Sequence, residues 1–201
     1  MFTGITTDLG RVLDVTAPRP GSDDRRFRIG TAFQMQDVAI GASIACSGCC
    51  LTVVEKGSDW FAVDVSNETM SKTTLGHWQT GARINLERSL KIGDELGGHL
   101  VLGHVDGVGK VEAVRDDGQS KRYTVSVAKD LSRFIAAKGS VCIDGVSLTV
   151  NEVDGARFGV NIIPHTQAVT TFGQRKAGDA VNVEIDLMAR YVARLNETLP
   201  K

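Results

Sequence analysis

Nucleophilic side chains stand at matching positions in two similar stretches of the chain. Residues 43–53 read SIACSGCCLTV and residues 140–150 read SVCIDGVSLTV, so Cys50 corresponds to Ser147. A thiol or a hydroxyl can add to an electrophilic carbon or polarise it. A lone cysteine is more often a small buried hydrophobe, but the serine at the equivalent position argues against a plain packing role for Cys50.

Strand periodicity predicts where these side chains point. Successive residues of a β-strand face opposite sides of the sheet, so Cys50 and Thr52 share one side and Leu51 takes the other. With Leu51 in the core, Cys50 and Thr52 face out of it, where a ligand can lie. Thr149 occupies the same register in the second stretch as Thr52 does in the first.

The match between the two stretches extends over most of the chain. The register holds without a gap at a spacing of 97 residues, from 43 and 140 as far as Glu87 and Glu184. Upstream, after an adjustment of two residues, Gly4 corresponds to Gly103. A repeat of this length is too long for a solenoid unit. It indicates two duplicated domains, each with a pocket of similar shape.

Both halves of the chain read as mainly β. In the second half, the runs 141–143, 146–153 and 158–163 are β-branched or alternate between apolar and polar residues. Two Asp-Gly dipeptides separate these runs, and such dipeptides supply the positive φ of tight hairpin turns. The 22 glycines and the short, evenly spaced strands favour a small closed barrel over a layered α/β fold. We therefore expect an all-β chain.

Helices are expected in three places. Short helical turns fit Glu68–Thr74 and the corresponding Thr166–Thr171. In the last segment, apolar residues recur every four positions from Leu187 to Leu199. This spacing indicates an amphipathic helix with Asp186 as its N-cap. The first half has no equivalent helix, because residues 89–98 lead directly into the second half.

Composition excludes several classes of function. The chain has 201 residues, of which 42% are apolar, and can bury one sizeable core or two compact ones. Its net charge of -1 does not indicate binding to nucleic acid or to an anionic membrane. No apolar run approaches the roughly 20 residues of a transmembrane helix.

The chain starts without the features of a secretory signal, so we expect a cytoplasmic protein with reduced cysteines. Cys46 and Cys49 have zinc-knuckle spacing, but no second pair completes a site, so we expect no metal.

Four motifs carry a family resemblance. They are MFTGI at residues 1–5, GCCLTV at 48–53, GGHLVLGHV at 97–105 and DGVSLT at 144–149. In this order they resemble the riboflavin synthases. The resemblance implies two tandem Greek-key six-stranded β-barrels related by internal duplication. It places the first lumazine-binding barrel at residues 1–97, the second at 98–186, and a C-terminal helix that joins three chains at 187–201.

The resemblance also implies a reaction. Each active site would lie between the first barrel of one chain and the second barrel of its neighbour in a homotrimer. There one 6,7-dimethyl-8-ribityllumazine would transfer a four-carbon unit to another. The products would be riboflavin and 5-amino-6-ribitylamino-2,4-pyrimidinedione, formed without a metal or redox cofactor. An association with lumazine synthase is a further expectation.

The substrate-binding residues that the resemblance implies fall into two sets, one in each half. The first set is Gly4, Ile5, Thr6, Ser43, Cys50, Leu51, Thr52, Asp64, Val65, Ser66, Asn67, Glu68 and Thr69. The second set is Gly103, His104, Val105, Lys138, Ser147, Leu148, Thr149, Ile162, Ile163, Pro164, His165, Thr166 and Gln167. Backbone groups at strand ends would pair with the pyrimidinedione ring, and Asp64 and Thr69 with ribityl hydroxyls. Family members usually have glutamate where this chain has His165, so an imidazole replaces a carboxylate that would hold sugar hydroxyls.

Four residues are candidates for catalysis. The two lumazines are identical but must react differently, because one loses a proton from its 7-methyl group and the other is attacked. The halves differ where Cys50 opposes Ser147 and where an aliphatic residue opposes His104. His104 is suited to moving protons at neutral pH, and Cys50 or Ser147 to polarising or attacking a ring carbon. Asp186 is either a helix cap alone or also a catalytic group, and His99 is expected to serve structure.

Two other functions remain open. A non-catalytic relative, similar to the lumazine- or flavin-binding luminescence proteins, would keep one ligand site and lose the other. The presence of Lys138, Ser147, Thr149 and His104 in the second half favours the enzyme. A flavoprotein reductase domain would show an Arg-x-Tyr-Ser-like flavin strand and a Gly-rich nucleotide domain, and the sequence contains neither.

Overall fold

Twelve strands make up most of the fold. A computed structural model describes residues 1–16 and 24–198. The first half contributes β1 (Asp8–Val15), β2 (Arg25–Gly30), β3 (Ser43–Cys46), β4 (Cys49–Lys56), β5 (Trp60–Val65) and β6 (Arg83–Arg88). The second half contributes β7 (Gly107–Asp117), β8 (Ser120–Ser126), β9 (Ser140–Ile143), β10 (Val146–Asp154), β11 (Arg157–Ile162) and β12 (Ala180–Ile185).

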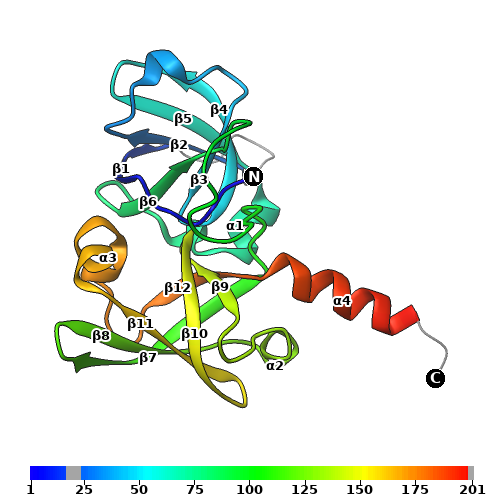
Figure 1. Cartoon of the computed structure of the whole chain (residues 1–201). Coiled ribbons are helices and arrows are strands. Elements are labelled where there is room, and N and C mark those ends of the chain that lie inside the picture. Colours follow the sequence, from blue (N-terminus) through cyan, green and yellow to red (C-terminus); the bar gives the residue numbers. More distant parts are fainter. Residues whose placement is uncertain (17–23, 199–201) are drawn as a thin grey trace.

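The strands of each half close into an antiparallel six-stranded barrel (Figure 1). Around the first barrel the order is β1, β2, β5, β4, β3, β6, and the second barrel repeats it as β7, β8, β11, β10, β9, β12. The connections from β2 to β3 and from β5 to β6 join strands that are not neighbours, which is a Greek-key arrangement. The all-β fold expected from the sequence is thereby confirmed.

Each barrel has its own core of inward-facing side chains. Phe27 and Phe61 are fully buried in the first barrel, and Tyr123 and Phe172 in the second. The rings of Tyr123 and Phe172 meet edge to face with centroids 5.2 Å apart. The Tyr123 hydroxyl donates to the Phe172 carbonyl at 2.6 Å, so its polar group is satisfied within the core. The two halves therefore bury apolar surface independently.

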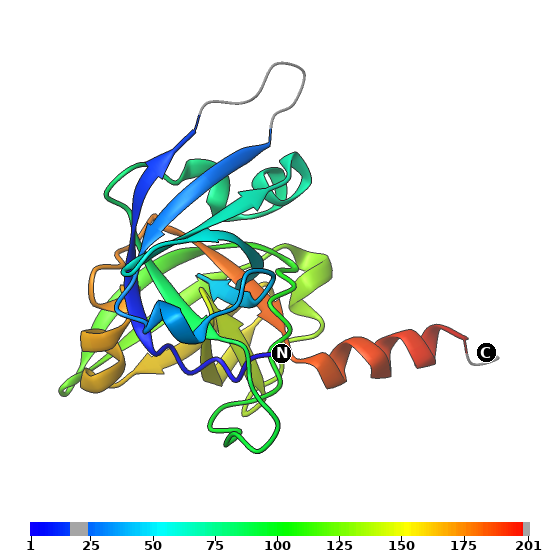
Figure 2. The same cartoon turned by 90° about the horizontal axis from the view of Figure 1, so that it is seen from above.

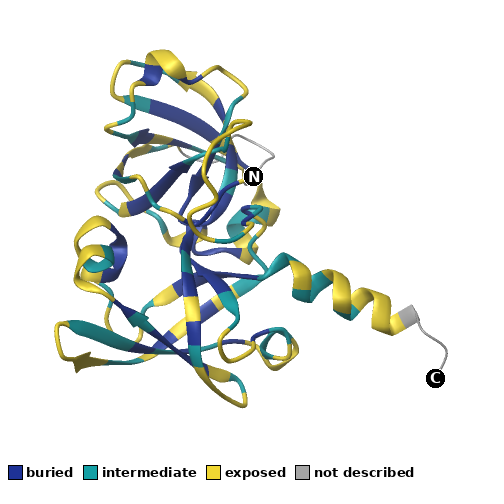
Figure 3. Cartoon of the chain, viewed as in Figure 1, coloured by how far each residue is buried: buried dark blue, intermediate teal, exposed yellow. Residues whose placement is uncertain are grey.

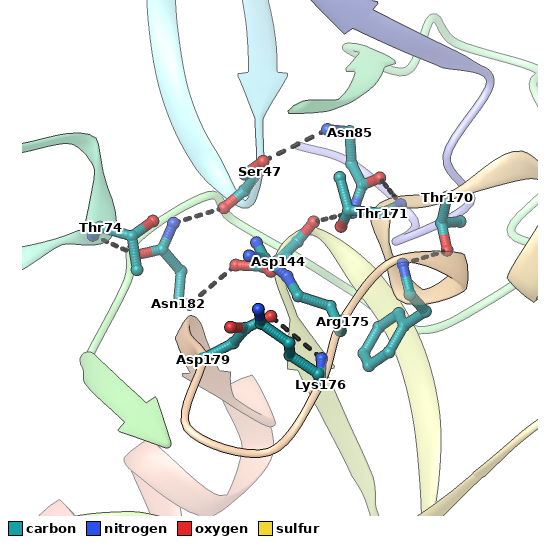
Figure 4. A network of polar contacts seen from close by, with 11 residues as sticks. Ser47, Thr74, Asn85, Asp144, Thr170, Thr171, Arg175, Lys176, Asp179 and Asn182 are labelled. Atoms are coloured by element: carbon teal, nitrogen blue, oxygen red, sulfur yellow. Dashed lines mark hydrogen bonds and ion pairs between the residues drawn. The ribbon is translucent and has the colours of Figure 1, made fainter. Parts of the chain in front are cut away.

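Reciprocal asparagines join the two barrels (Figure 4). Asn85 Nδ2 donates to Thr171 Oγ1 at 3.0 Å, and Asn85 Oδ1 accepts from the Thr171 amide at 2.8 Å. At the equivalent place, Asn182 Nδ2 donates to the Ser47 carbonyl at 2.8 Å, and Asn182 Oδ1 accepts from the Thr74 amide at 2.7 Å. Buried amides need such partners, and here each barrel supplies them to the other. The network thus sets how the two repeats dock.

The two short helices occur close to the expected positions. They are α1 (Asn67–Lys72) and α3 (Pro164–Val169), each followed by a 3-10 turn, at Thr74–His77 and Thr171–Gly173. Both begin one or two residues before the expected start. Pro164 fits the first position of a helix because its fixed φ suits the turn and its missing N–H is not needed there. A further one-turn helix, α2 (Lys129–Ser132), and a 3-10 turn at Met35–Asp37 are too short for sequence periodicity to reveal.

The C-terminal helix α4 (Leu187–Thr198) points away from both barrels (Figures 1 and 2). Asp186 Oδ1 accepts from the Met188 amide at 2.9 Å, which confirms the expected N-cap. One apolar face of the helix is exposed (Figure 3), and its residues are Met188, Tyr191, Val192 and Leu195. Leu199, the last residue of the expected stripe, lies outside the described residues. None of the helices described is long and apolar enough to cross a bilayer.

Candidate active site

Cys50 and Ser147 face outward from equivalent strands of the two barrels. On β4, Leu51 packs in the core with 6% of its surface exposed, while Cys50 is half-buried. On β10, Leu148 is 9% exposed and Ser147 is half-buried. The alternation read from the sequence is therefore confirmed in both halves, and each candidate nucleophile keeps part of its surface exposed.

Exposed hydroxyl groups extend each of these surfaces by two residues. Thr52 on β4 is exposed and pairs with Ser43 on β3. Thr149 on β10 is exposed and pairs with Ser140 on β9. The exposed Lys138 precedes β9 and has the left-handed φ of 67°. The second barrel therefore offers a cation near its hydroxyl row.

The loops that approach these residues come from the opposite half of the sequence. The Cys50 amide donates to the Gly103 carbonyl at 2.9 Å, and the Ser147 amide donates to the Gly4 carbonyl at 2.8 Å. The sequence halves suggested instead that Gly4 would join Cys50 and that Gly103 would join Ser147. The structure corrects this grouping. By position along these loops, Ile5 and Thr6 belong with Ser147, and His104 and Val105 with Cys50.

An antiparallel bridge between Phe2 and Val101 explains the exchange. The Phe2 amide donates to the Val101 carbonyl at 2.7 Å, and the Val101 amide donates back at 3.1 Å. Both side chains are buried in a small cluster with Ala45 from the first barrel and Cys142 from the second. The segments that lead into the two barrels therefore cross between them, and each ends on the neighbouring barrel.

A buried glutamate anchors each crossing loop. Glu184 on β12 accepts hydrogen bonds from the three successive amides of residues 102–104, at 2.7, 2.9 and 3.0 Å. Glu87 on β6 accepts from the amides of Thr3 and Gly4 at 2.7 and 2.9 Å. Burial raises the pKa of both carboxyl groups, and these hydrogen bonds lower it in part. The carboxylates hold the two loops in equivalent positions.

Ser147 has an imidazole as its side-chain partner. His99 Nδ1 lies 2.6 Å from Ser147 Oγ. Burial lowers the pKa of His99, and the charge of Asp186 raises it. The sequence pattern assigned His99 to structure and did not connect it with Ser147. The contact joins residues 48 positions apart through the linker between the barrels, so no local motif or repeat register points to it.

His104 and Asp186 occupy different surroundings. His104 is exposed on the loop that packs against Cys50, and Glu184 holds its backbone. Asp186 caps α4 and also acts electrostatically on His99. Its carboxylate therefore has a structural contact and an electrostatic effect on a candidate site residue.

The segments expected to hold the ribityl chains lie at equivalent strand ends. Residues 64–69 run from the end of β5 into α1, and residues 162–167 run from the end of β11 into α3. Arg26 holds Asp64 through two hydrogen bonds, from Nε at 2.7 Å and from a terminal nitrogen at 2.9 Å. Any ligand hydroxyl that reaches Asp64 therefore meets a carboxylate already oriented by a guanidinium.

The two segments differ in how their helices begin. Ser66 Oγ accepts from the Thr69 amide at 3.3 Å and caps α1. At the same place before α3, Ile163 offers no side-chain cap, and the exposed His165 lies in the first turn. Gln167 Nε2 donates to the Ile162 carbonyl at 2.8 Å. The second segment thus has Ile163 where the first has Ser66 and His165 where the first has Glu68, while Thr69 and Thr166 keep a hydroxyl in both.

Burial makes three of the four cysteines unreactive. Burial raises the pKa of Cys49 to about 12 and raises the pKa of Cys46 and Cys142 well above their ordinary value. All four cysteines have free thiols. Since the thiolate is the reactive form, the half-buried Cys50 is the thiol placed for reaction.

A cavity of about 600 Å³ lies between the N-terminal segment and the linker. Its lining includes Ile5, Phe33, Glu87, Leu90 and Gly97. The volume is in the range of small-molecule sites.

Comparison with known proteins agrees with this architecture. The family model described as the lumazine binding domain matches residues 3–89 and again residues 102–186. A riboflavin synthase of Brucella abortus is 53% identical over 97% of this chain and 98% of its own length. A riboflavin synthase of Photobacterium phosphoreum is 40% identical over 97% of this chain and 88% of its own length.

Solved structures show the same fold. The crystal structure of LumP complexed with riboflavin has a TM-score of 0.83 and 26% identity, covering 92% of this chain and 99% of LumP. The structure of LumP complexed with 6,7-dimethyl-8-(1'-D-ribityl)lumazine has a TM-score of 0.80 and 25% identity over the same shares. With two lumazine binding domains and close relatives along its whole length, the chain belongs to the riboflavin synthase family.

Proposed function

We propose that the chain converts two molecules of 6,7-dimethyl-8-ribityllumazine into riboflavin and 5-amino-6-ribitylamino-2,4-pyrimidinedione. The observation that carries this proposal is the equivalence of the Cys50 and Ser147 surfaces, each closed by a glutamate-anchored loop from the other half. A reaction between two identical molecules needs two pockets of one shape, and the duplicated barrel supplies them. The riboflavin synthase of Brucella abortus, at 53% identity, supports the assignment.

Positioning accounts for much of the catalysis in this scheme. Holding two rings in reacting geometry replaces a bimolecular encounter, and effective molarities on the order of 10⁵ M or more can result. One lumazine loses a proton from its 7-methyl group and becomes the nucleophilic partner, while the other is attacked. The four-carbon unit then passes between them. Neither a metal nor a redox cofactor is required by this balance of bonds.

The regrouped loops define the two proposed lumazine sites. The first comprises Cys50, Leu51, Thr52, residues 64–69 and the loop Gly103, His104 and Val105. The second comprises Ser147, Leu148, Thr149, Lys138, residues 162–167 and the loop Gly4, Ile5 and Thr6. The backbone contacts of Cys50 with Gly103 and of Ser147 with Gly4 support this division.

The side chains have distinct roles in the proposal. His104, exposed on the loop beside Cys50, moves protons at the first site. Cys50 or Ser147 polarises or attacks a ring carbon. The Asp64 carboxylate, oriented by Arg26, binds ribityl hydroxyls at the first site. At the second site His165, which stands where the first half has Glu68, contacts the ribityl chain.

Three chains assemble in the proposed enzyme, and each active site is shared between neighbours. The exposed apolar face of α4 supports an association, because Met188 and Leu195 are each 66% exposed on a helix that leaves the barrels. In such a trimer the first barrel of one chain faces the second barrel of the next. We further place the protein in the cytoplasm, where it associates with lumazine synthase.

A ligand carrier is the second candidate function. LumP, whose structures contain riboflavin or the lumazine, matches this fold with a TM-score of 0.83. A carrier would hold one ligand per chain and would not consume it. The retention of both Cys50 and Ser147 with complete surrounding loops favours turnover.

The test is an assay of the purified protein with the lumazine alone. Two lumazines should disappear for each riboflavin formed, without added metal or nicotinamide, and a chelator should leave the rate unchanged. Tight binding of one lumazine per chain without conversion would replace the enzyme by the carrier. Riboflavin formed at any other ratio, or activity lost to chelator, would refute the proposed reaction.

A further inference from the structure

The contact between His99 and Ser147 is built into the crossing of the two halves. The His99 amide donates to the Thr3 carbonyl at 3.1 Å, next to the bridge between Phe2 and Val101. At the preceding Gly98 a Cβ would lie 2.1 Å from the Thr3 oxygen and 2.9 Å from the Ser147 Cβ. Only a glycine fits there, so the linker lies directly on Ser147. The backbone that carries the His99 imidazole is therefore held against Ser147.

His99 Nδ1 is the hydrogen-bond partner of the Ser147 hydroxyl. The distance of 2.6 Å is short for a bond between a hydroxyl and an imidazole. Among the described residues, Ser147 Oγ has no other hydrogen-bond partner, and the buried His99 Nε2 has none. In the tautomer whose Nδ1 is unprotonated, the Ser147 hydroxyl donates to Nδ1, and both lone pairs of the serine oxygen are left for a ligand.

The surroundings of His99 suit a proton acceptor. Burial lowers the pKa of His99, which keeps the imidazole neutral before reaction. The charge of Asp186 raises the same pKa and stabilises the imidazolium once it forms. The Ser147 hydroxyl is thus paired with an imidazole whose charged form a carboxylate favours, an arrangement that allows an alcohol to gain basic character.

Cys50, the residue of the first half that corresponds to Ser147, has different surroundings. Within the described part of the chain, Cys50 Sγ makes no side-chain hydrogen bond, whereas Ser147 Oγ is paired with His99. The two sites are therefore equivalent in backbone and unequal in proton chemistry. This difference distinguishes two lumazines that are otherwise identical.

We propose that His99 is a positioning residue that acts through Ser147 and makes the lumazine on the second barrel the one that loses its methyl proton. The inference rests on the proposed function. The C–H bond of the 7-methyl group breaks and its electron pair enters the lumazine ring. Ser147 Oγ takes that proton while its own hydroxyl proton passes to His99 Nδ1. The products of the step are a lumazine anion and an imidazolium that the charge of Asp186 stabilises, so charge and atoms balance.

The experiment measures exchange of the 7-methyl protons in deuterated water by NMR, alongside kcat and the lumazine Kd. Exchange reports the proposed proton removal without the later steps. His99→Ala should slow exchange and kcat by about 100-fold, in line with loss of a general base, while Kd changes little. His99→Asn can still accept the Ser147 hydrogen bond but cannot hold a proton, so it should preserve the fold and Kd and still exchange slowly. His77→Asn is the matched control, since His77 lies in an exposed turn outside both sites.

A double-mutant cycle separates this role from simple packing. If His99 acts through Ser147, the Ser147→Ala protein should lose no further exchange rate when His99→Ala is added. Additive losses, or His99→Asn with the exchange rate of the unmodified protein, would overturn the inference. An unmodified protein that forms no riboflavin would instead overturn the proposed function. An active protein whose exchange rate is unchanged by His99→Ala would leave that function intact and remove the role of His99.

Discussion

Gly103 packs directly on Cys50: a Cβ at Gly103 would lie 2.6 Å from the Cys50 Cβ, and Gly103 has φ +78°. Gly4 has the same relation to Ser147, with a Cβ distance of 2.6 Å and φ +75°. Only glycine permits both this backbone conformation and so close an approach. The backbone of each candidate nucleophile is therefore held by a loop from the other half.

Replacing Gly103 by alanine should separate its loop from Cys50. We expect a loss of unfolding free energy beyond the about 1–2 kcal/mol that left-handed backbone alone costs, together with a large fall in turnover. Urea denaturation and kcat measure the two effects. Gly81→Ala is the control, since Gly81 has φ +94° but no atom within 4 Å of a Cβ. Equal losses in the two variants would show that the contact at Cys50 contributes nothing.

Replacing Glu184 by glutamine should loosen the loop that carries His104. One amide oxygen would remain for three backbone donors, and the new NH₂ group would face them. Leaving buried donors without partners costs about 1–3 kcal/mol, and turnover should fall because the His104 position is no longer fixed. Glu87→Gln should destabilise the protein comparably while loosening the Gly4 loop instead.

Hydrogen exchange distinguishes the two loops. The amides of residues 102–104 should lose protection in Glu184→Gln, and those of residues 3 and 4 in Glu87→Gln. Unchanged protection of residues 102–104 in Glu184→Gln would contradict the anchoring role of the carboxylate.

Repetition and alternation in the sequence were sufficient to predict much of the fold. They predicted two barrels, the outward direction of Cys50, the two short helices and the Asp186 cap. These features depend on local periodicity, on turn residues and on an internal repeat, all of which are written along the chain. The starts of the short helices were displaced because the Ser66 cap and Pro164 act at single positions, which a periodic pattern does not resolve.

The arrangement of the loops could not be predicted in the same way. A repeat register states that Gly4 and Gly103 are equivalent, but it does not state which barrel each one lies on. That choice is made by the bridge between Phe2 and Val101, which joins distant parts of the chain. The pairing of His99 with Ser147 follows from the same crossing, so it too is visible only once the halves are docked.

The apolar face of α4 should be required for association. Tyr191→Glu places a charge at a side chain that is 59% exposed in the single chain, in the middle of the apolar face. We expect the protein to become monomeric and to lose activity, as after removal of residues 187–201, because each proposed site needs two chains. Arg194→Gln, on a polar part of the same helix, should leave both properties unchanged. A protein that is monomeric by light scattering and fully active in the assay would contradict the shared-site model.

His99 should make stability depend on pH in a defined direction. Its pKa in the folded protein is lowered from 6.5, so the unfolded chain takes up the proton first as pH falls. Stability from this group is therefore fully present above the unfolded value of 6.5 and is lost as pH falls from 6.5 through the folded pKa. Asp186, the charged neighbour of His99, opposes part of the shift. The difference in unfolding free energy between about pH 7.5 and pH 5.5 should be smaller in His99→Asn than in the unmodified protein. An identical difference in both proteins would mean that His99 titrates normally.

Replacements at Cys50, Ser147 and His104 should show that the two sites have different roles in turnover. If both barrels merely bound lumazine, Cys50→Ser and Ser147→Cys would have nearly symmetrical effects. We expect unequal losses of turnover with lumazine binding retained in both, because only Ser147 has an imidazole partner.

His104→Gln should lower turnover and flatten its pH dependence near neutrality, since it removes an exposed imidazole from the loop beside Cys50. A side chain that acts mainly in the transition state lowers kcat and kcat/KM together, whereas one that only holds substrate raises KM. Measuring both constants for the three variants separates these cases. An unchanged kcat in His104→Gln between about pH 5 and pH 9 would remove the proton-transfer role and leave His104 as a residue of loop structure.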